Sequence, residues 1–151
     1  MVKSLFQATS VAEVKSRIGS LTSECQRQWG TMTPAQALAH CQVAMRMAFG
    51  EVVLPRSMVG RLIGPTVKKA MLVRGAPMRR NAPTHPKVLI KDDRDLAVER
   101  KQLTDLIDRF AQTRPSDFTY HPHFFFGRLT PEEWATLQYL HLDHHLRQFG
   151  A

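Results

Sequence analysis

Apolar residues recur at steps of three and four positions in several stretches of the chain, a spacing typical of amphipathic helices. In the stretch TPAQALAHCQVAMRMAFG, for example, Leu38, Met45 and Phe49 would lie on one side of such a helix. The same spacing returns after residue 95 and in the last part of the chain. It predicts four main helices, over residues 34–49, 57–73, 95–113 and 131–149, and a short first helix over residues 11–18.

Two of these helices carry strong start signals. Thr33 and Thr130 are each followed by a proline, which suits the first helical position, and by Gln or Glu three positions after the threonine. This arrangement predicts a capping box, in which two side chains satisfy free backbone N–H groups of the first turn. The helix over residues 57–73 is weaker, because Gly60 and Gly64 interrupt it and a break is expected near Pro65.

Two irregular segments separate the helices. Residues 74–94 contain three prolines, and at about 20 residues this segment is longer than ordinary connections. Residues 118–129, FTYHPHFFFGRL, are rich in phenylalanine and too short for a helix of their own. No stretch shows a convincing strand pattern. The sequence therefore predicts an all-α fold, a four-helix bundle forming a single domain over residues 1–151, with a long irregular basic loop.

The formal net charge of +8 allows acidic small molecules, nucleic acid or anionic lipid as partners without choosing among them. Residues 74–94 hold six Lys or Arg against two Asp, and they include no aromatic residue. The stacking platform that single-stranded nucleic acid requires is therefore missing, and no nucleic-acid partner is expected. Two interpretations stay open for this basic segment: a solvated surface loop, or a binding element for an anionic small molecule.

Location and redox state follow from what the sequence lacks. No apolar run approaches the roughly 18 residues of a membrane span, and the first residues do not resemble a signal peptide. We therefore expect a cytoplasmic protein with no membrane partner. Cys25 and Cys41 form no CxxC pair, and reduced, partly buried thiols are the simplest interpretation of both.

Three of the seven histidines fall within residues 141–145. His141 and His145 are four positions apart and would be neighbours on one helix face, and His144 offers a second pairing with His141. Two ligands are too few for a catalytic zinc site, which normally has three protein ligands and one open position. The best third candidate is His40, in the helix over residues 34–49. Spacing alone leaves open whether His40 is a metal ligand or a hydrogen-bonded core residue.

Three blocks of sequence carry a resemblance to a known family. In their order along the chain, WGTMTPAQALAHC, HPHFFFGRLTPEEW and LHLDHHLRQFG are similar to the DinB/YfiT-like superfamily. The resemblance implies a four-helix bundle in which an upstream histidine and a C-terminal HxxxH pair bind a divalent metal. Carried over by position, the implied ligands are His40, His141 and His145, with His144 as a neighbour. Imidazole ligands accept nickel, zinc or iron.

The resemblance also suggests activities. Some superfamily members are thiol-dependent transferases or isomerases that use bacillithiol, mycothiol or glutathione, and others have no known reaction. We therefore expect a metal-dependent enzyme, either a low-molecular-weight thiol transferase or a related hydrolase acting on a small-molecule substrate. The alternative is a non-catalytic metal-binding or stress-associated interaction module of the same fold. A homodimer is plausible for either.

Further site residues can be proposed around the histidines. If the basic loop folds over the bundle mouth, Arg79, Arg80 and Lys87 could hold the carboxylates of a co-substrate such as glutathione. His121 and His123 are candidates for a general acid or base. The alternative for His121 and His123 is that they belong to a loop anchored by its phenylalanines. Metal-binding imidazoles need outer hydrogen-bond partners, for which Asp143, Gln36 and Gln148 are candidates. Asp143 would point away from His141, so Gln148 or a backbone carbonyl is favoured.

Overall fold

The computed structural model describes residues 2–151, and within them the fold is all-helical. No strand occurs in this part of the chain, apart from an isolated bridge between His123 and Gly127. The all-α prediction is therefore confirmed. The α-helices are α1 (Ala8–Ser20), α2 (Pro34–Ala48), α3 (Met58–Lys68), α4 (Leu96–Gln112) and α5 (Pro131–Gln148). None of the helices in the described region is long and apolar enough to cross a membrane.

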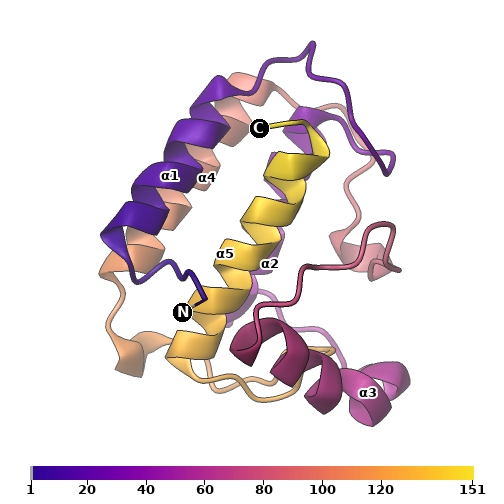
Figure 1. Ribbon diagram of the computed structural model, residues 1–151, viewed down its shortest axis with the longest axis vertical. Coiled ribbons are helices and arrows are strands. Elements are labelled where there is room, and N and C mark those ends of the chain that lie inside the picture. The colour runs from indigo at the N-terminus through magenta and orange to yellow at the C-terminus, as the bar shows by residue number, and fades with distance from the viewer. Residues whose placement is uncertain (1) are drawn as a thin grey trace.

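Four of the helices form the main body of the molecule. Helix α1 packs against α4 and α5, and α2 packs against α4 and α5, whereas α3 lies outside this group (Figure 1). Apolar side chains from all four helices fill the space between them. The largest side chains that are fully buried there include Val14, Ile18, Met45, Leu103, Ile107, Phe110, Trp134, Leu142 and Leu146.

The predicted capping boxes are present at the start of α2 and α5. The Thr33 hydroxyl accepts a hydrogen bond from the backbone N–H of Gln36, and the Gln36 side chain accepts one from the N–H of Thr33. Thr130 and Glu133 form the same pair of bonds. These bonds determine where each helix begins. They therefore also determine on which turn of α2 His40 lies, and on which turns of α5 His141 and His145 lie.

The expected break at Pro65 does not occur, and this prediction was wrong. Helix α3 continues through Pro65 to Lys68 and then runs into a π-helical turn, Lys69–Val73. Pro65 cannot donate to the carbonyl of Arg61, but Arg61 is on the exposed side of the helix, where water can replace the missing bond.

The two glycines that were expected to weaken α3 allow it to pack closely. A Cβ atom on Gly60 would lie 2.6 Å from the carbonyl oxygen of Phe125, so glycine lets α3 approach that backbone closely.

The basic segment after α3 is irregular, as predicted, with one short 3₁₀ turn at Pro86–Val88. This turn packs against α2. The segment therefore connects the outlying α3 with the helix that carries His40, and it runs beside α2 and α5 (Figure 1).

Candidate metal centre

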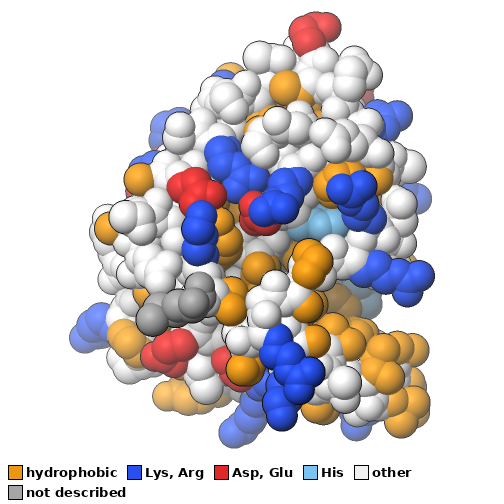
Figure 2. All heavy atoms as spheres, viewed as in Figure 1, with side chains coloured by type: hydrophobic (Ala, Val, Ile, Leu, Met, Phe, Trp, Pro, Cys, Tyr) orange, Lys and Arg blue, Asp and Glu red, His pale blue; other side chains and the backbone are white. Residues whose placement is uncertain are grey.

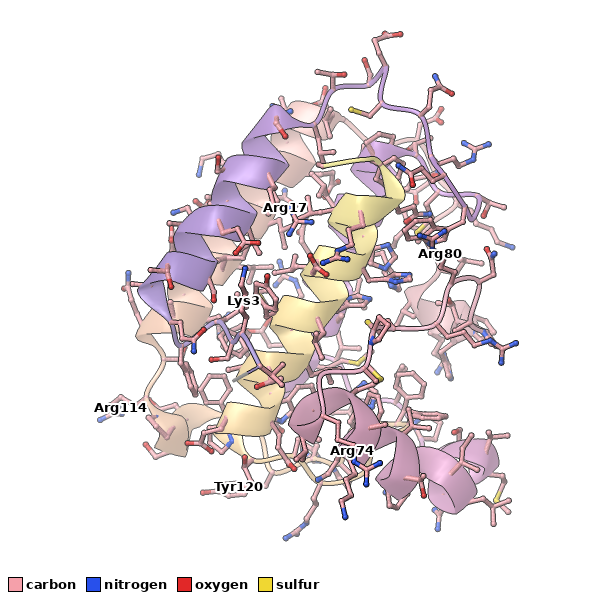
Figure 3. All side chains as sticks on the ribbon, viewed as in Figure 1. Lys3, Arg17, Arg74, Arg80, Arg114 and Tyr120 are labelled. Atoms are coloured by element: carbon pink, nitrogen blue, oxygen red, sulfur yellow. The ribbon has the colours of Figure 1, made fainter. Side chains whose placement is uncertain are left out.

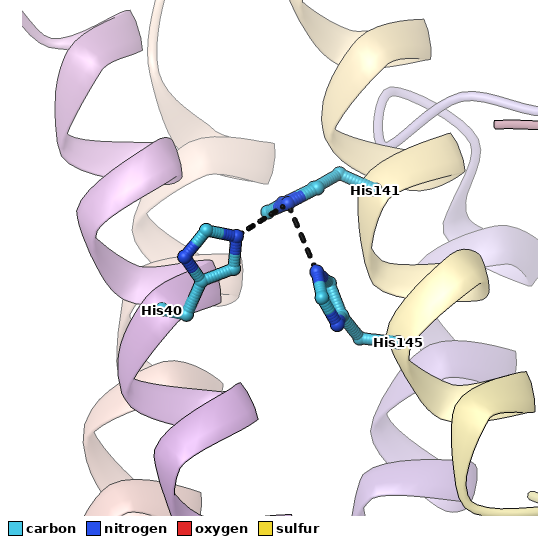
Figure 4. A group of neighbouring side chains, drawn as sticks. All are labelled: His40, His141 and His145. Carbon is cyan, nitrogen blue, oxygen red and sulfur yellow. Dashed lines mark hydrogen bonds between the residues drawn. The ribbon is translucent and has the colours of Figure 1, made fainter. Parts of the chain in front are cut away.

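The structure brings three histidines together from two helices. His40 comes from α2, and His141 and His145 come from successive turns of α5 (Figure 4). The Nε2 atom of His141 lies 3.0 Å from Nε2 of His40 and 3.2 Å from Nε2 of His145. His40 and His145 are buried, and His141 is partly exposed. His40 and His141 are 101 positions apart in the sequence, yet their rings lie within hydrogen-bond distance of each other.

The outer nitrogens of two rings are fixed by acceptors. Nδ1 of His40 lies 2.8 Å from the carbonyl oxygen of Val88, and Nδ1 of His145 lies 2.9 Å from Oε1 of Gln148. Both oxygens only accept hydrogen bonds, so Nδ1 carries the proton in each ring and Nε2 presents a lone pair. Gln148 and a backbone carbonyl, the partners favoured from the sequence, thus contact His145 and His40, whereas Nδ1 of His141 has no hydrogen-bond partner in the described chain. The imidazoles are oriented as metal ligands are.

This donor set suits a divalent metal better than it suits a hydrogen-bonded core. Ligands at about 2.0–2.1 Å from a tetrahedral ion lie about 3.3 Å apart, close to the distances from Nε2 of His141 to Nε2 of His40 and of His145. The Nε2 lone pairs of His40 and His145 both face Nε2 of His141. His141 can donate a hydrogen bond to only one of them at a time. Its Nδ1 is buried and has no hydrogen-bond partner within the described chain. The three-histidine group could hold a metal ion.

Burial keeps the three rings neutral. Exclusion of water lowers the pKa of His40, although the bond to Val88 acts in the opposite direction. Burial, followed by repulsion from His40, lowers the pKa of His145 to about 3. The pKa of His141 falls well below its ordinary value for the same reason, with the other histidines adding to the effect. At neutral pH all three rings are uncharged, which is the form that binds metal.

Gln148 links the cluster to the segment before α2. Its Nε2 donates to the carbonyl oxygen of Trp29 at 2.8 Å, which leaves Oε1 for His145. The neighbouring Gly30 has a φ of +75°, and a Cβ atom there would lie 2.6 Å from Nε2 of Gln148. Glycine is required at this position both by its backbone conformation and by the close approach of Gln148.

Changing Gln148 to alanine should weaken metal binding by about 10- to 100-fold, the usual effect of losing an outer hydrogen-bond partner. The ring of His145 would lose the acceptor that fixes its orientation and its tautomer. Titration with zinc in competition with a chelator measures the change. Arg147→Ala, at an exposed position of the same turn, is the matched control and should bind as the native protein does. Equal affinity for Gln148→Ala and the native protein would contradict this role.

Of the three basic residues predicted to bind a co-substrate, Arg80 is linked through Trp29 to His144, a neighbour of the cluster. Its guanidinium carbon lies 4.2 Å from the ring centre of Trp29, and the Trp29 ring lies 5.3 Å from that of His144. All three basic side chains are exposed, but nothing in the described structure connects Arg79 or Lys87 to the histidines. Figure 2 shows a histidine surface in a hollow bordered by basic and hydrophobic side chains, and Figure 3 labels Arg80 on the same face.

The two candidate acid–base histidines have different positions. His121 is exposed. In His123, Nδ1 accepts hydrogen bonds from the backbone N–H groups of Phe125 and Phe126, and the ring lies edge-on to Trp134. Burial, with a smaller contribution from the charge of Arg56, lowers the pKa of His123 to about 3. These contacts favour the structural alternative, in which His123 holds the phenylalanine-rich turn in place.

Residues 2–151 match the family described as "Protein of unknown function (DUF1569)". The chain belongs to this family. No curated protein and no solved structure matches it.

In this DUF1569 protein, neither cysteine joins the histidines. Cys41 follows His40 directly but is buried in the core, and burial raises the pKa of its thiol. Cys25 is partly exposed and lies close to Thr22. Trp29, whose ring contacts His144 and Arg80, was not singled out from the sequence. The signal that could have pointed to it is its place at the start of the block that contains His40, next to a glycine.

Proposed function

We propose that this protein is a DinB-like four-helix-bundle enzyme that depends on a divalent metal held by His40, His141 and His145. The observation that carries the proposal is the convergence of three Nε2 atoms, two of them with lone pairs facing inward because their Nδ1 atoms donate elsewhere. Zinc, nickel and iron(II) are the candidate ions for an all-imidazole site.

The number of ligands supports catalysis over a purely structural role. No fourth His, Cys, Asp or Glu joins the group within residues 2–151. Structural zinc sites usually have four protein ligands, whereas catalytic sites have three and leave a position for water or substrate. His141 is the partly exposed ligand, so such a molecule would reach the centre from the side of His141.

A bound divalent ion would supply a thiolate or a hydroxide at neutral pH. In the proposed reaction, the thiolate sulfur forms a bond to an electrophilic carbon of the substrate. The leaving group departs with its bonding electrons, and the thiol proton goes to solvent. In the related hydrolysis, water takes the place of the thiol. During the reaction, the Val88 carbonyl and the Gln148 side chain would keep the rings of His40 and His145 in place.

Arg80 and Trp29 would form the binding rim for the thiol co-substrate. The guanidinium of Arg80 can make paired hydrogen bonds to a carboxylate such as those of glutathione. The ring of Trp29 positions that guanidinium, and the buried Nε1–H of Trp29 has no hydrogen-bond partner in the described residues. Through the contact of Trp29 with His144, Arg80 lies on the side of α5 that carries the cluster.

Two measurements test the proposal. Metal content should fall strongly in His40→Ala and His145→Ala. It should stay close to native in His144→Ala, which removes the imidazole next to His145 on α5. The metal-loaded protein should then conjugate glutathione or another small thiol to an activated aryl halide or hydrolyse an ester, and His141→Ala should abolish this turnover.

Equal metal content in all three variants would contradict the ligand assignment. Metal that depends on the histidines, without turnover on any thiol or ester in the screen, would support the non-catalytic metal-binding module instead.

A further inference from the structure

Helix α3 exposes apolar side chains that nothing in the described structure covers. Met58 is 73% exposed, Val59 59%, Leu62 80% and Ile63 48%. Met58 and Leu62 are four positions apart, as are Val59 and Ile63, so the four side chains form two adjacent rows on one face of the helix. Figure 2 shows hydrophobic surface gathered over this part of the molecule.

The opposite face of α3 explains how the helix can be held while its apolar face stays exposed. Gly60 and Gly64 are the buried residues of α3, and both lie against the backbone of Phe125. This glycine contact, with the backbone bond from the Ser57 N–H to the Phe124 carbonyl, attaches α3 to the rest of the molecule. The apolar rows are therefore not needed to build the core.

The stretch of sequence that contains this apolar face is rich in cations and has no acidic residue. Residues 52–91 contain nine Lys or Arg and no Asp or Glu, which is more positive charge than the net +8 of the whole chain. Lys68 is paired with Glu133. Arg61, Lys69 and Arg74 are exposed, and none of them has an ion-pair partner in the described structure. Figure 3 shows Arg74 projecting from the segment that follows α3.

This combination favours one occupant among several. A second copy of the chain would bring its own cations against these, and the like charges would repel each other. Nucleic acid would gain charge contacts, but an aliphatic face offers its bases nothing to stack on. An exposed apolar helix face bordered by Lys and Arg is the pattern of a helix that lies in the interface of an anionic membrane.

We propose that α3 docks the protein onto a bilayer surface that contains anionic phospholipids. Met58, Leu62 and Ile63 enter the interface below the headgroups, and Arg61 and Lys69 contact the phosphates. The helix lies on the membrane and does not cross it. This proposal replaces the expectation of no membrane partner, which rested on the length of apolar runs and did not consider the exposed face of a short helix.

Sedimentation with lipid vesicles tests the proposal on the full chain. The native protein should sediment with vesicles of phosphatidylglycerol and phosphatidylcholine and remain in solution with phosphatidylcholine alone. Binding should weaken steeply as salt is raised, because surface cations are screened. In Arg61→Gln/Lys69→Gln/Arg74→Gln the affinity should fall by about 100-fold, at roughly fivefold for each cation.

The apolar part of the proposal has its own variants. Leu62→Gln/Ile63→Gln keeps the helix propensity and the charge, and it should lose at least tenfold in affinity. Val98→Gln on α4, a residue 50% exposed, and Arg27→Gln, an exposed arginine before α2, are the matched apolar and charge controls and should bind as the native protein does. Circular dichroism checks that each variant is folded.

A direct readout of insertion completes the test. Tryptophan placed by Leu62→Trp should shift its emission to the blue on mixing with anionic vesicles, and tryptophan placed by Val98→Trp should not. Failure of the native protein to bind anionic vesicles, or equal binding by the charge and apolar variants, would overturn the proposal. A dimer in solution that Leu62→Gln/Ile63→Gln dissociates would assign the face to a second copy instead.

Discussion

Saturating zinc is expected to raise the midpoint of thermal unfolding by about 8–16 °C. A ligand at 1,000 times its dissociation constant stabilises the folded state by about 4 kcal/mol, and each kcal/mol moves the midpoint by about 2–4 °C in a chain of this size. The folded state alone brings Nε2 of His40 to 3.0 Å from Nε2 of His141, so the ion binds the folded chain selectively. Thermal unfolding followed by circular dichroism, with chelator and with zinc, measures the shift.

The His141→Ala variant should lose nearly all of this increase, because His141 contributes the central nitrogen of the cluster. His141 is one of only three protein ligands, so its removal should weaken binding by more than the roughly 10- to 100-fold that follows loss of an outer hydrogen-bond partner. His144→Ala is the control and should keep the full shift. The ligand assignment fails if His141→Ala is stabilised as much as the native protein, or if zinc, nickel and iron(II) all leave the native midpoint unchanged.

Acidification of the metal-free protein from pH 7 to pH 5 should lower the free energy of unfolding by about 2 kcal/mol through His123 alone. The pKa of this residue is lowered to about 3 in the folded state and lies near 6.5 in the unfolded chain. Between these values the unfolded state binds the extra proton, so the stabilising effect is complete above pH 6.5 and is lost as the pH falls toward 3. Urea unfolding in the presence of a chelator measures the loss.

His123→Asn isolates this contribution. The Oδ1 atom of asparagine can accept the backbone N–H bonds that Nδ1 of His123 accepts, but the side chain does not titrate. The loss of stability between pH 7 and pH 5 should therefore shrink by about 2 kcal/mol. His121→Asn changes an exposed histidine of the same segment and serves as the control. An unchanged pH dependence in His123→Asn would show that burial does not hold this ring neutral.

The helices that hold the candidate ligands could be predicted because their start signals are local. A threonine, a proline and a Gln or Glu within one turn determine where α2 and α5 begin, and both capping boxes are present. The predicted start of α1 was three residues too late, because its N-cap residue, Gln7, is not one of the usual capping types and makes no side-chain cap bond. The continuation of α3 through Pro65 depends on which side of the helix faces water, and that is a tertiary property.

The candidate site was predictable only in part, for a related reason. His141, His145 and Gln148 lie within two turns of one helix, so helix geometry alone relates them. His40 reaches them through the packing of α2 on α5, a contact that the spacing left open and that the family resemblance implied. The Val88 carbonyl and Arg80 belong to an irregular segment, whose path depends on contacts made by residues far away in the sequence.

The different environments of the two cysteines make the protein suitable for selective chemical labelling. Thiol reagents act on the thiolate, and burial of Cys41 both raises its pKa and keeps the reagent out. A maleimide dye added to the folded protein therefore attaches at Cys25, in the segment between α1 and α2. Modification of Cys41 requires the core beside His40 to open, so its rate of alkylation reports directly on how often that core opens.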